Sequence, residues 1–359
     1  MNHSASPPKA VDFGYRSVRL RVGGVVAVRL SLRTLAVNTV LAAVAVGVAV
    51  LSLGFGDFPL TPGQVVGALT GQGDDFHRLI VLEWRLPMAI GAVLFGALLG
   101  VGGAVFQSLT RNPLGSPDVI GFDAGAYTGV VLTMLVLGTQ HYAAVSTAAI
   151  TGGLLTAGAV YLLAHRRGVQ GFRLIIVGIA VSAMLGSVNS YLITRADIDD
   201  AMSVGFWGAG SLSRVGWAAL MPSLIGGALV LGCVAVLAPA LRQLELGDDA
   251  ALAQGVGAAR VRPALLVTGV ATTALVTAAA GPIGFVALAA PQLARRLTRT
   301  PGVTVASAAF MGAALVALAH AVSLAIAQAY RPVPVGLITV CLGGLYLIRL
   351  LIRETRRSV

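Results

Sequence analysis

The chain has 359 residues, of which 57% are hydrophobic and 11% are charged. Soluble domains carry about 25% charged residues, so this composition excludes an ordinary soluble protein and is typical of a polytopic membrane protein. The formal net charge of +11 comes mainly from arginines that separate long apolar runs. That pattern indicates membrane orientation signals rather than nucleic-acid binding.

Ten apolar runs predict an all-α membrane protein with about ten transmembrane helices, because one span takes about 20 apolar residues. The runs lie at about 34–53, 88–108, 119–138, 143–164, 172–193, 218–240, 261–280, 282–297, 303–328 and 333–352. The seventh and eighth are the weakest, since Gly281 and Pro282 interrupt a long charge-free stretch there. A re-entrant or tilted segment is the alternative at that point.

The basic residues predict the orientation of these spans. Ten spans put both ends of the chain on one face, and that face then carries 20 of the 25 lysines and arginines. The positive-inside rule makes it the cytoplasmic face. We therefore expect a basic cytoplasmic tail at 1–33, a transmembrane domain at 34–353 and a cytoplasmic tail at 354–359. The opposite face carries Arg78, Arg85, Arg195, Arg214 and Arg331.

Two longer loops, 54–87 and 194–217, lie on the outer face in this topology. Thr61 followed by proline is a helix-start signal, so the first loop should contain a short helix. In the second loop, Trp207 and Trp217 stand where an interfacial aromatic belt is expected.

A few polar side chains fall within the spans. Gln107 lies near the end of the second span, and Ser182 and Asn189 lie on the fifth. We interpret these three as lining a translocation path, with hydrogen bonding between neighbouring helices as the alternative. His320, on the ninth span, has no carboxylate near it in the sequence, which favours a packing role over a proton relay.

The inner-face loop 242–262 predicts a short helix outside the bilayer. Asp248 and Asp249 stand in its first turn and Gly255 follows its last residue, which matches the charge and capping preferences of helix ends. Such a helix offers a surface on which a cytoplasmic partner can push. The other inner segment of note, 111–118, is either a tight turn or a further contact for that partner.

No motif for catalysis or for a bound cofactor is present. The sequence has no P-loop, no dinucleotide fingerprint, and neither an HExxH nor a CxxC metal motif. We therefore predict a protein that is not an enzyme and has neither metal nor cofactor. If transport is driven by ATP, a separate polypeptide must hydrolyse it.

Several motifs occur in a fixed order along the chain and resemble one known family. They are RLP at 85–87, GALLGVGGAVFQSLTRNPLGSPDVIGFDAGA at 96–126, LGDDAALAQGV at 246–256, GPIGFVALAAPQLARR at 281–296 and PVGLITVCLGGLYLI at 334–348. Together they resemble the permease of the iron-siderophore and vitamin B12 ABC importers, the FecCD type. The segment NPLGSPDVIGFDAGAYTG is most similar to the ferric-enterobactin branch.

The resemblance implies a subunit of the cytoplasmic (inner) membrane that pairs with a second permease. We expect this partner to be a different chain, with a homodimer as the alternative. Two ATPase subunits would dock on the coupling loop from the cytoplasm, and a siderophore-binding protein would dock outside. The coupling residues carried over are Gly247, Asp248, Asp249, Ala250, Ala253, Gly255 and Val256. Docking of the binding protein falls on Arg85 and Arg331.

This chain departs from the family pattern at four places, one of which is Arg331, where the family more often has an acidic residue before Leu-Pro. Gln254 stands where leucine is usual, which puts the seating of the coupling loop in doubt. Met88 replaces a second docking arginine, and Gln292 follows a proline where histidine is common.

We expect an ATP-dependent importer that moves ferric siderophore complexes into the cytoplasm, with the iron carried as its chelate. Import of vitamin B12 or haem is one alternative. A proton-coupled secondary transporter that uses His320 and Asp123 is the alternative from another class.

Overall fold

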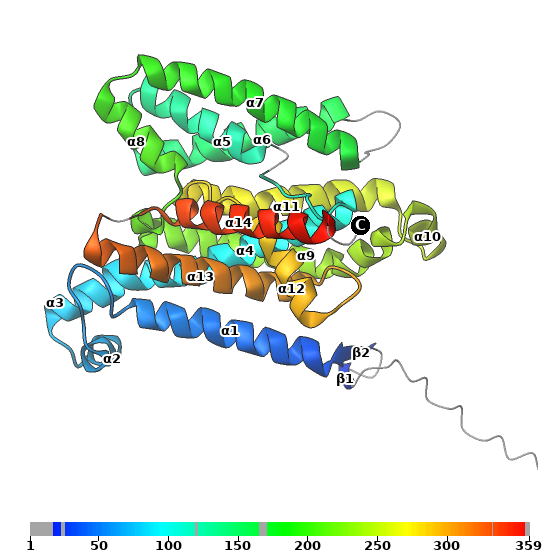
Figure 1. Cartoon of the computed structure of the whole chain (residues 1–359), viewed down its shortest axis with the longest axis horizontal. Coiled ribbons are helices and arrows are strands. Elements are labelled where there is room, and N and C mark those ends of the chain that lie inside the picture. Colours follow the sequence, from blue (N-terminus) through cyan, green and yellow to red (C-terminus); the bar gives the residue numbers. More distant parts are fainter. Residues whose placement is uncertain (1–16, 23–25, 119–120, 165–170, 332, 356–359) are drawn as a thin grey trace, which may run out of the picture.

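The computed structural model describes residues 17–22, 26–118, 121–164, 171–331 and 333–355. They form a helical bundle preceded by one short hairpin (Figure 1). The long helices are α1 (Leu32–Ser52), α4 (Leu86–Thr110), α6 (Tyr142–Ala164), α7 (Gly171–Arg195), α9 (Trp217–Glu245), α11 (Ala258–Ala280), α13 (Val305–Ala329) and α14 (Val335–Thr355). The medium ones are α5 (Phe122–Val131), continued by η2 (Leu132–Val136), α8 (Ile198–Gly208) and α12 (Val286–Thr298). The short ones are α2 (Pro62–Thr70), α3 (Asp75–Arg78), η1 (Leu79–Arg85), η3 (Leu212–Arg214) and α10 (Asp248–Ala253).

Each of the ten predicted runs coincides with one of these helices. Among the described residues, seven helices are long and apolar enough to cross a membrane, and two shorter apolar segments, Phe122–Val136 and Val335–Tyr346, accompany them. The weak eighth run is α12, which has 13 residues and therefore a length of about 20 Å. The predicted interruption before it is present, because Gly281 and Phe285 both take positive φ there, at 75° and 67°.

Helix α4 lies at the centre of the larger layer, where it packs against α13, α11, α12 and α9 (Figure 1). Glycines allow these close approaches. A methyl group on Gly96 would overlap the backbone of Gly312, and one on Gly103 would overlap the carbonyl oxygen of Ala287. Membrane helices have no hydrophobic force driving them together in lipid, so they depend on close van der Waals contact of this kind.

Gly103→Leu should therefore prevent α4 from packing on α12, and most of the protein in the membrane should then fail to fold. The matched control is Gly47→Leu on α1, because a side chain at Gly47 meets nothing within 4 Å. Size-exclusion chromatography of the solubilised protein measures the folded fraction. Equal folded yields for the two variants would contradict this packing.

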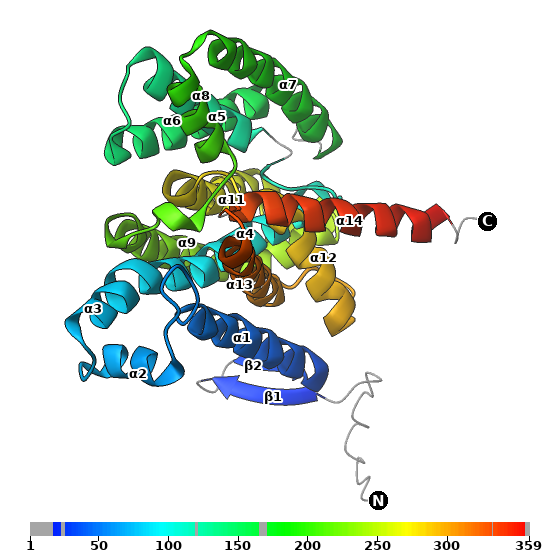
Figure 2. The same cartoon turned by 60° about the vertical axis from the view of Figure 1, so that its left-hand side comes forward.

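Helices α5 to α8 form a second layer beside the α4 layer (Figure 2). Phe122, Val130 and Val204 are completely or almost completely buried in its core. The layer joins the rest of the bundle through α11, against which both α5 and α6 pack. One bond at this joint is the hydroxyl of Ser146, which donates to the carbonyl of Ala278 at 2.9 Å.

The two ends of the bundle differ. Helices α2, α3 and α8 lie at one end, whereas α10, the hairpin and the C-terminal end of α14 lie at the other (Figure 1). The first group comes from the predicted outer loops and the second from the predicted cytoplasmic segments. The helix predicted after Thr61 is α2, and its capping box with Gln64 is complete.

Two expectations need correction. The segment 1–33 is not entirely a tail, because strands β1 (Ser17–Val22) and β2 (Val26–Ser31) pair antiparallel directly before α1. The coupling loop is shorter than 242–262, since α9 continues to Glu245 and α11 begins at Ala258.

Candidate functional site

The short helix α10 lies between α9 and α11. It is at the end of the bundle that the sequence predicts to be cytoplasmic, which we call the inner end, and the opposite end is called the outer end. A glycine with positive φ flanks it on each side, Gly247 at 119° and Gly255 at 83°, and glycine adopts such angles without a Cβ penalty. Ala251 is fully buried, and its carbonyl accepts a bond from the Val256 N–H at 2.8 Å. The predicted helix is therefore confirmed, with Asp248 and Asp249 in its first turn.

Asp248 joins three parts of the inner end. Its Oδ1 accepts from Nη2 of Arg111 at 2.8 Å and from Nη2 of Arg262 at 2.7 Å. Arg111 caps the C-terminus of α4, and Arg262 lies in the first turns of α11. Exposed ion pairs contribute only about 0–1 kcal/mol to stability, and the Asp248 side chain is 48% exposed. We therefore interpret this clamp as a device for positioning α10 rather than for holding the fold together.

A second set of contacts ties the same end of α4 to α9 and α12. Ser108 donates to the Glu245 carboxylate at the end of α9. Gln107 donates to the carbonyl of Leu288 at 3.0 Å and accepts from Gln292 at 2.7 Å. A displacement of α10 would therefore move α4, α9 and α11 directly, and it would reach α12 through α4.

The surface of α10 and its flanking residues that points away from the bundle is partly apolar. Leu246 and Leu252 are 68% and 67% exposed, although they lie outside the apolar spans. The residues predicted for coupling divide into exposed ones and half-buried ones. Exposed are Asp248, Asp249, Ala253 and Gly255, and half-buried are Gly247, Ala250 and Val256. Neither leucine was among the coupling residues predicted from the sequence. The signal that could have found them is the presence of an apolar residue on each side of the acidic pair in a segment outside the membrane spans.

Arg85 has a different environment from the one expected of a docking residue. It is 8% exposed, and its Nη1 and Nη2 donate to the carbonyls of Leu53 and Phe58 at 2.8 and 2.6 Å. It therefore holds the start of the outer loop against η1, and its guanidinium does not face outward in this conformation. A docking role for Arg85 stays a prediction. Arg331, the second predicted docking residue, is exposed at the outer end.

Arg85→Met should lower the free energy of unfolding by about 2–3 kcal/mol, because it leaves a buried carbonyl, that of Leu53, and a partly buried one, that of Phe58, without their charged donor. Arg78→Met, at an outer arginine whose side chain is 44% exposed, is the control and should change stability by less than about 1 kcal/mol. Thermal denaturation in detergent compares the two. If Arg85→Met unfolds at the control's temperature but binds the binding protein less tightly, docking is the correct assignment.

The three predicted path residues face the interior of the subunit. Gln107 is 3% exposed and is used in the contacts described above, and Asn189 is also 3% exposed. The Ser182 hydroxyl is buried close to Gly121, at the start of α5. Gln107 bonds to α12, as the alternative of hydrogen bonding between helices predicts, whereas Ser182 Oγ and Asn189 Oδ1 have no hydrogen-bond partner among the described residues. A role of the three residues in a path stays a prediction.

The relay suggested for the secondary-transporter alternative is not assembled. Asp123 accepts a bond from Thr277 of α11 at 3.2 Å, whereas His320 lies on α13 beside an outer cavity with Arg331. Within the described part of the chain, no three residues of the metal-binding types come together.

Comparison with known proteins identifies this arrangement. Residues 30–353 match the FecCD transport family. The chain belongs to this family. A FecCD member is a permease and not itself an enzyme, and the coupling-loop position and the apolar bundle described above agree with that assignment.

Curated FecCD relatives share much of the chain. It is 45% identical to the ferric enterobactin transport system permease protein FepG of Escherichia coli K12 over 303 residues, which cover 84% of this chain and 91% of FepG. It is 34% identical to FepD, the ferric enterobactin transport system permease protein of the same organism, over 69% of this chain and 74% of FepD.

A solved structure shares the fold. An ABC transporter described as of the metal-chelate type, in an inward-facing conformation, superposes with a TM-score of 0.78 and 26% identity. The superposition covers 89% of this chain and 99% of the other. The FecCD architecture thus extends over nearly all the described helices.

Proposed function

We propose that this FecCD permease is a subunit of an ATP-dependent importer that moves ferric siderophore complexes through the inner membrane into the cytoplasm. The observation that carries the proposal is α10, a helix held at the inner end by Asp248, with the exposed Leu252 on it and the exposed Leu246 just before it. The 45% identity to a ferric enterobactin permease supports the cargo.

The proposed topology has ten transmembrane helices, α1, α4, α5, α6, α7, α9, α11, α12, α13 and α14, with both termini in the cytoplasm. Support comes from the common location of α10, the hairpin and the end of α14 (Figure 1). In this arrangement α12 crosses only part of the membrane, and the non-helical backbone of 281–285 lies within the bundle. The Ala280 carbonyl, directly before this segment, accepts from the Ser211 N–H at 2.7 Å.

The proposed assembly contains a second permease, two cytoplasmic ATPase subunits and an outer siderophore-binding protein. Two ferric enterobactin permeases, FepG and FepD, both resemble this chain, which favours a partner permease that is a different chain over a homodimer. The permease itself holds neither cofactor nor metal. ATP is used by the partner, and iron passes as its chelate.

Reconstitution in proteoliposomes tests the proposal. With the ATPase, the second permease and the binding protein present, uptake of a radiolabelled ferric siderophore should require ATP on the side of the membrane where the ATPase is bound. Vitamin B12 and haem, offered with the same components, should not accumulate. ATP-independent uptake driven by a proton gradient would overturn the proposal in favour of a secondary transporter.

A further inference from the structure

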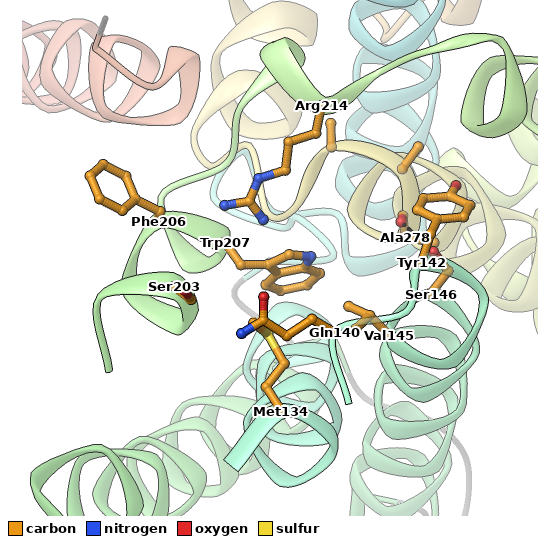
Figure 3. Close-up of a pocket in the computed structure, with 12 residues that line it drawn as sticks. Met134, Gln140, Tyr142, Val145, Ser146, Ser203, Phe206, Trp207, Arg214 and Ala278 are labelled. Atoms are coloured by element: carbon orange, nitrogen blue, oxygen red, sulfur yellow. Dashed lines mark hydrogen bonds between the residues drawn. The ribbon is translucent and has the colours of Figure 1, made fainter. Parts of the chain in front are cut away.

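The outer end of the subunit contains two cavities that share one arginine. The larger, of about 470 Å³, lies among η2, α6, α8 and the end of α11 (Figure 3). The smaller, of about 380 Å³, lies between η3 and the outer ends of α13 and α14. Phe206 and Arg214 line both of them. Ligand pockets have volumes of about 300–1,000 Å³, so each cavity is large enough to hold part of a small molecule.

The position of Arg214 is fixed by its neighbours in the short helix η3. Leu212 is fully buried and Val215 is 2% exposed, so the backbone is anchored on both sides of the arginine. Ser211 adds a bond from its side chain to the Ser213 N–H at 3.2 Å. The guanidinium extends toward the Trp207 ring, over the larger cavity (Figure 3).

The charged side chains that line the two cavities are all positive. Arg214 and Arg331 are the charged side chains among the described residues that line them, and no carboxylate lies among those residues. Partial burial lowers the pKa of the Arg214 guanidinium, but arginine ionises at so high a pH that the group stays charged. A cationic cavity without a carboxylate attracts anions and excludes cations.

Aromatic rings form much of the remaining wall. Trp207 is 6% exposed and stacks on Tyr127 with the ring centroids 6.1 Å apart, so its orientation is fixed. Phe206 and Tyr142 are 53% and 42% exposed and line the larger cavity. Rings held in this way present flat surfaces on which another ring stacks.

We propose that the cavities around Arg214 form an entry subsite for an anionic iron chelate that carries aromatic rings. Arg214 pairs with the negative charge, and Trp207 and Phe206 contact the rings. This inference rests on the proposed function and deepens it, because it names the class of chelate that this subunit receives. Strongly anionic ferric catecholates fit the subsite, whereas aliphatic hydroxamate complexes of low charge lack both features.

The first test replaces the charge in the complete reconstituted transporter, with a ferric tris-catecholate as the probe. Arg214→Gln should lower the ATP-driven uptake rate about tenfold, which corresponds to one charged hydrogen bond, and Arg214→Lys should restore most of it. Arg195→Gln is the matched control, an exposed outer arginine that lines neither cavity. Equal uptake by Arg214→Gln and Arg195→Gln, or failure of lysine to restore the rate, would overturn the inference.

The second test fills the larger cavity. Ser203→Trp places a ring in the cavity, whereas Met202→Trp places one at an adjacent α8 residue that is 55% exposed and lines neither cavity. Only the first should reduce uptake, and neither should change the affinity for the binding protein. A loss of that affinity in Arg214→Gln would show a docking contact instead of a chelate subsite. Wild-type transport of the probe separates these outcomes from failure of the proposed function, which would abolish uptake in every variant and the wild type alike.

Discussion

Leu252→Asp should abolish ATP-driven uptake and detach the ATPase while leaving the subunit folded. Leu252 is 67% exposed at the inner end, so its replacement disturbs no packing within the chain. Burial of a leucine side chain at an interface contributes about 1.5–3 kcal/mol, and the aspartate adds an unpaired charge. We expect the affinity of the ATPase to fall at least about 100-fold.

The control for this prediction is Leu297→Asp. Leu297 belongs to α12 at the same end of the bundle and is 46% exposed. Co-purification of the ATPase with each variant, followed by a titration of its binding, distinguishes them. If both variants retain the ATPase equally, Leu252 is not part of the docking surface.

Asp248→Asn should uncouple ATP hydrolysis from uptake rather than detach the ATPase. The amide keeps the shape of the side chain but loses the charge that holds Arg111 and Arg262. Helix α10 would then move without transmitting its displacement to α4 and α11. We expect the number of chelates imported per ATP hydrolysed to fall by up to about fivefold, the factor that corresponds to the loss of an exposed ion pair of about 1 kcal/mol.

Asp249→Asn is the matched control, because it removes the same charge from the adjacent residue, which has no ion pair among the described residues. Uptake and ATP hydrolysis are measured in the same proteoliposomes. An equal ratio of the two in both variants would show that the Asp248 clamp carries no motion. Unfolding temperatures should agree for both variants, since half-exposed ion pairs contribute little stability.

The sequence predicted most of the fold because the signals for it are local. Apolar runs give the long helices, the glycine–proline pair gives the break before α12, and the acidic start and terminal glycine give α10. The hairpin has a local signal as well, since polar and apolar residues alternate along Ser17–Val22 and β-branched residues recur in Val26–Ser31. The basic residues of 1–33 instead favoured the prediction of a cytoplasmic tail.

The site was harder to predict because it depends on residues far apart in the chain. Asp248 and Arg111 are 137 positions apart, and no local sequence pattern indicates that their side chains are in contact. Arg85 matched a docking motif, yet its partners are the carbonyls of Leu53 and Phe58, whose positions depend on how the outer loop folds back. Arg214 showed no motif at all, and only the packing of η3 places it over two cavities.

The central claim is that the ATPase acts on the subunit through α10, and cysteine cross-linking tests it most directly. Cys233 and Cys341, which are exposed, are first replaced by serine. Leu252→Cys and Leu246→Cys should then cross-link to the ATPase of the assembled transporter in high yield, while Val66→Cys, 58% exposed at the outer end, should not. An ATPase that cross-links to neither Leu252→Cys nor Leu246→Cys but to another surface of the inner end would contradict this claim.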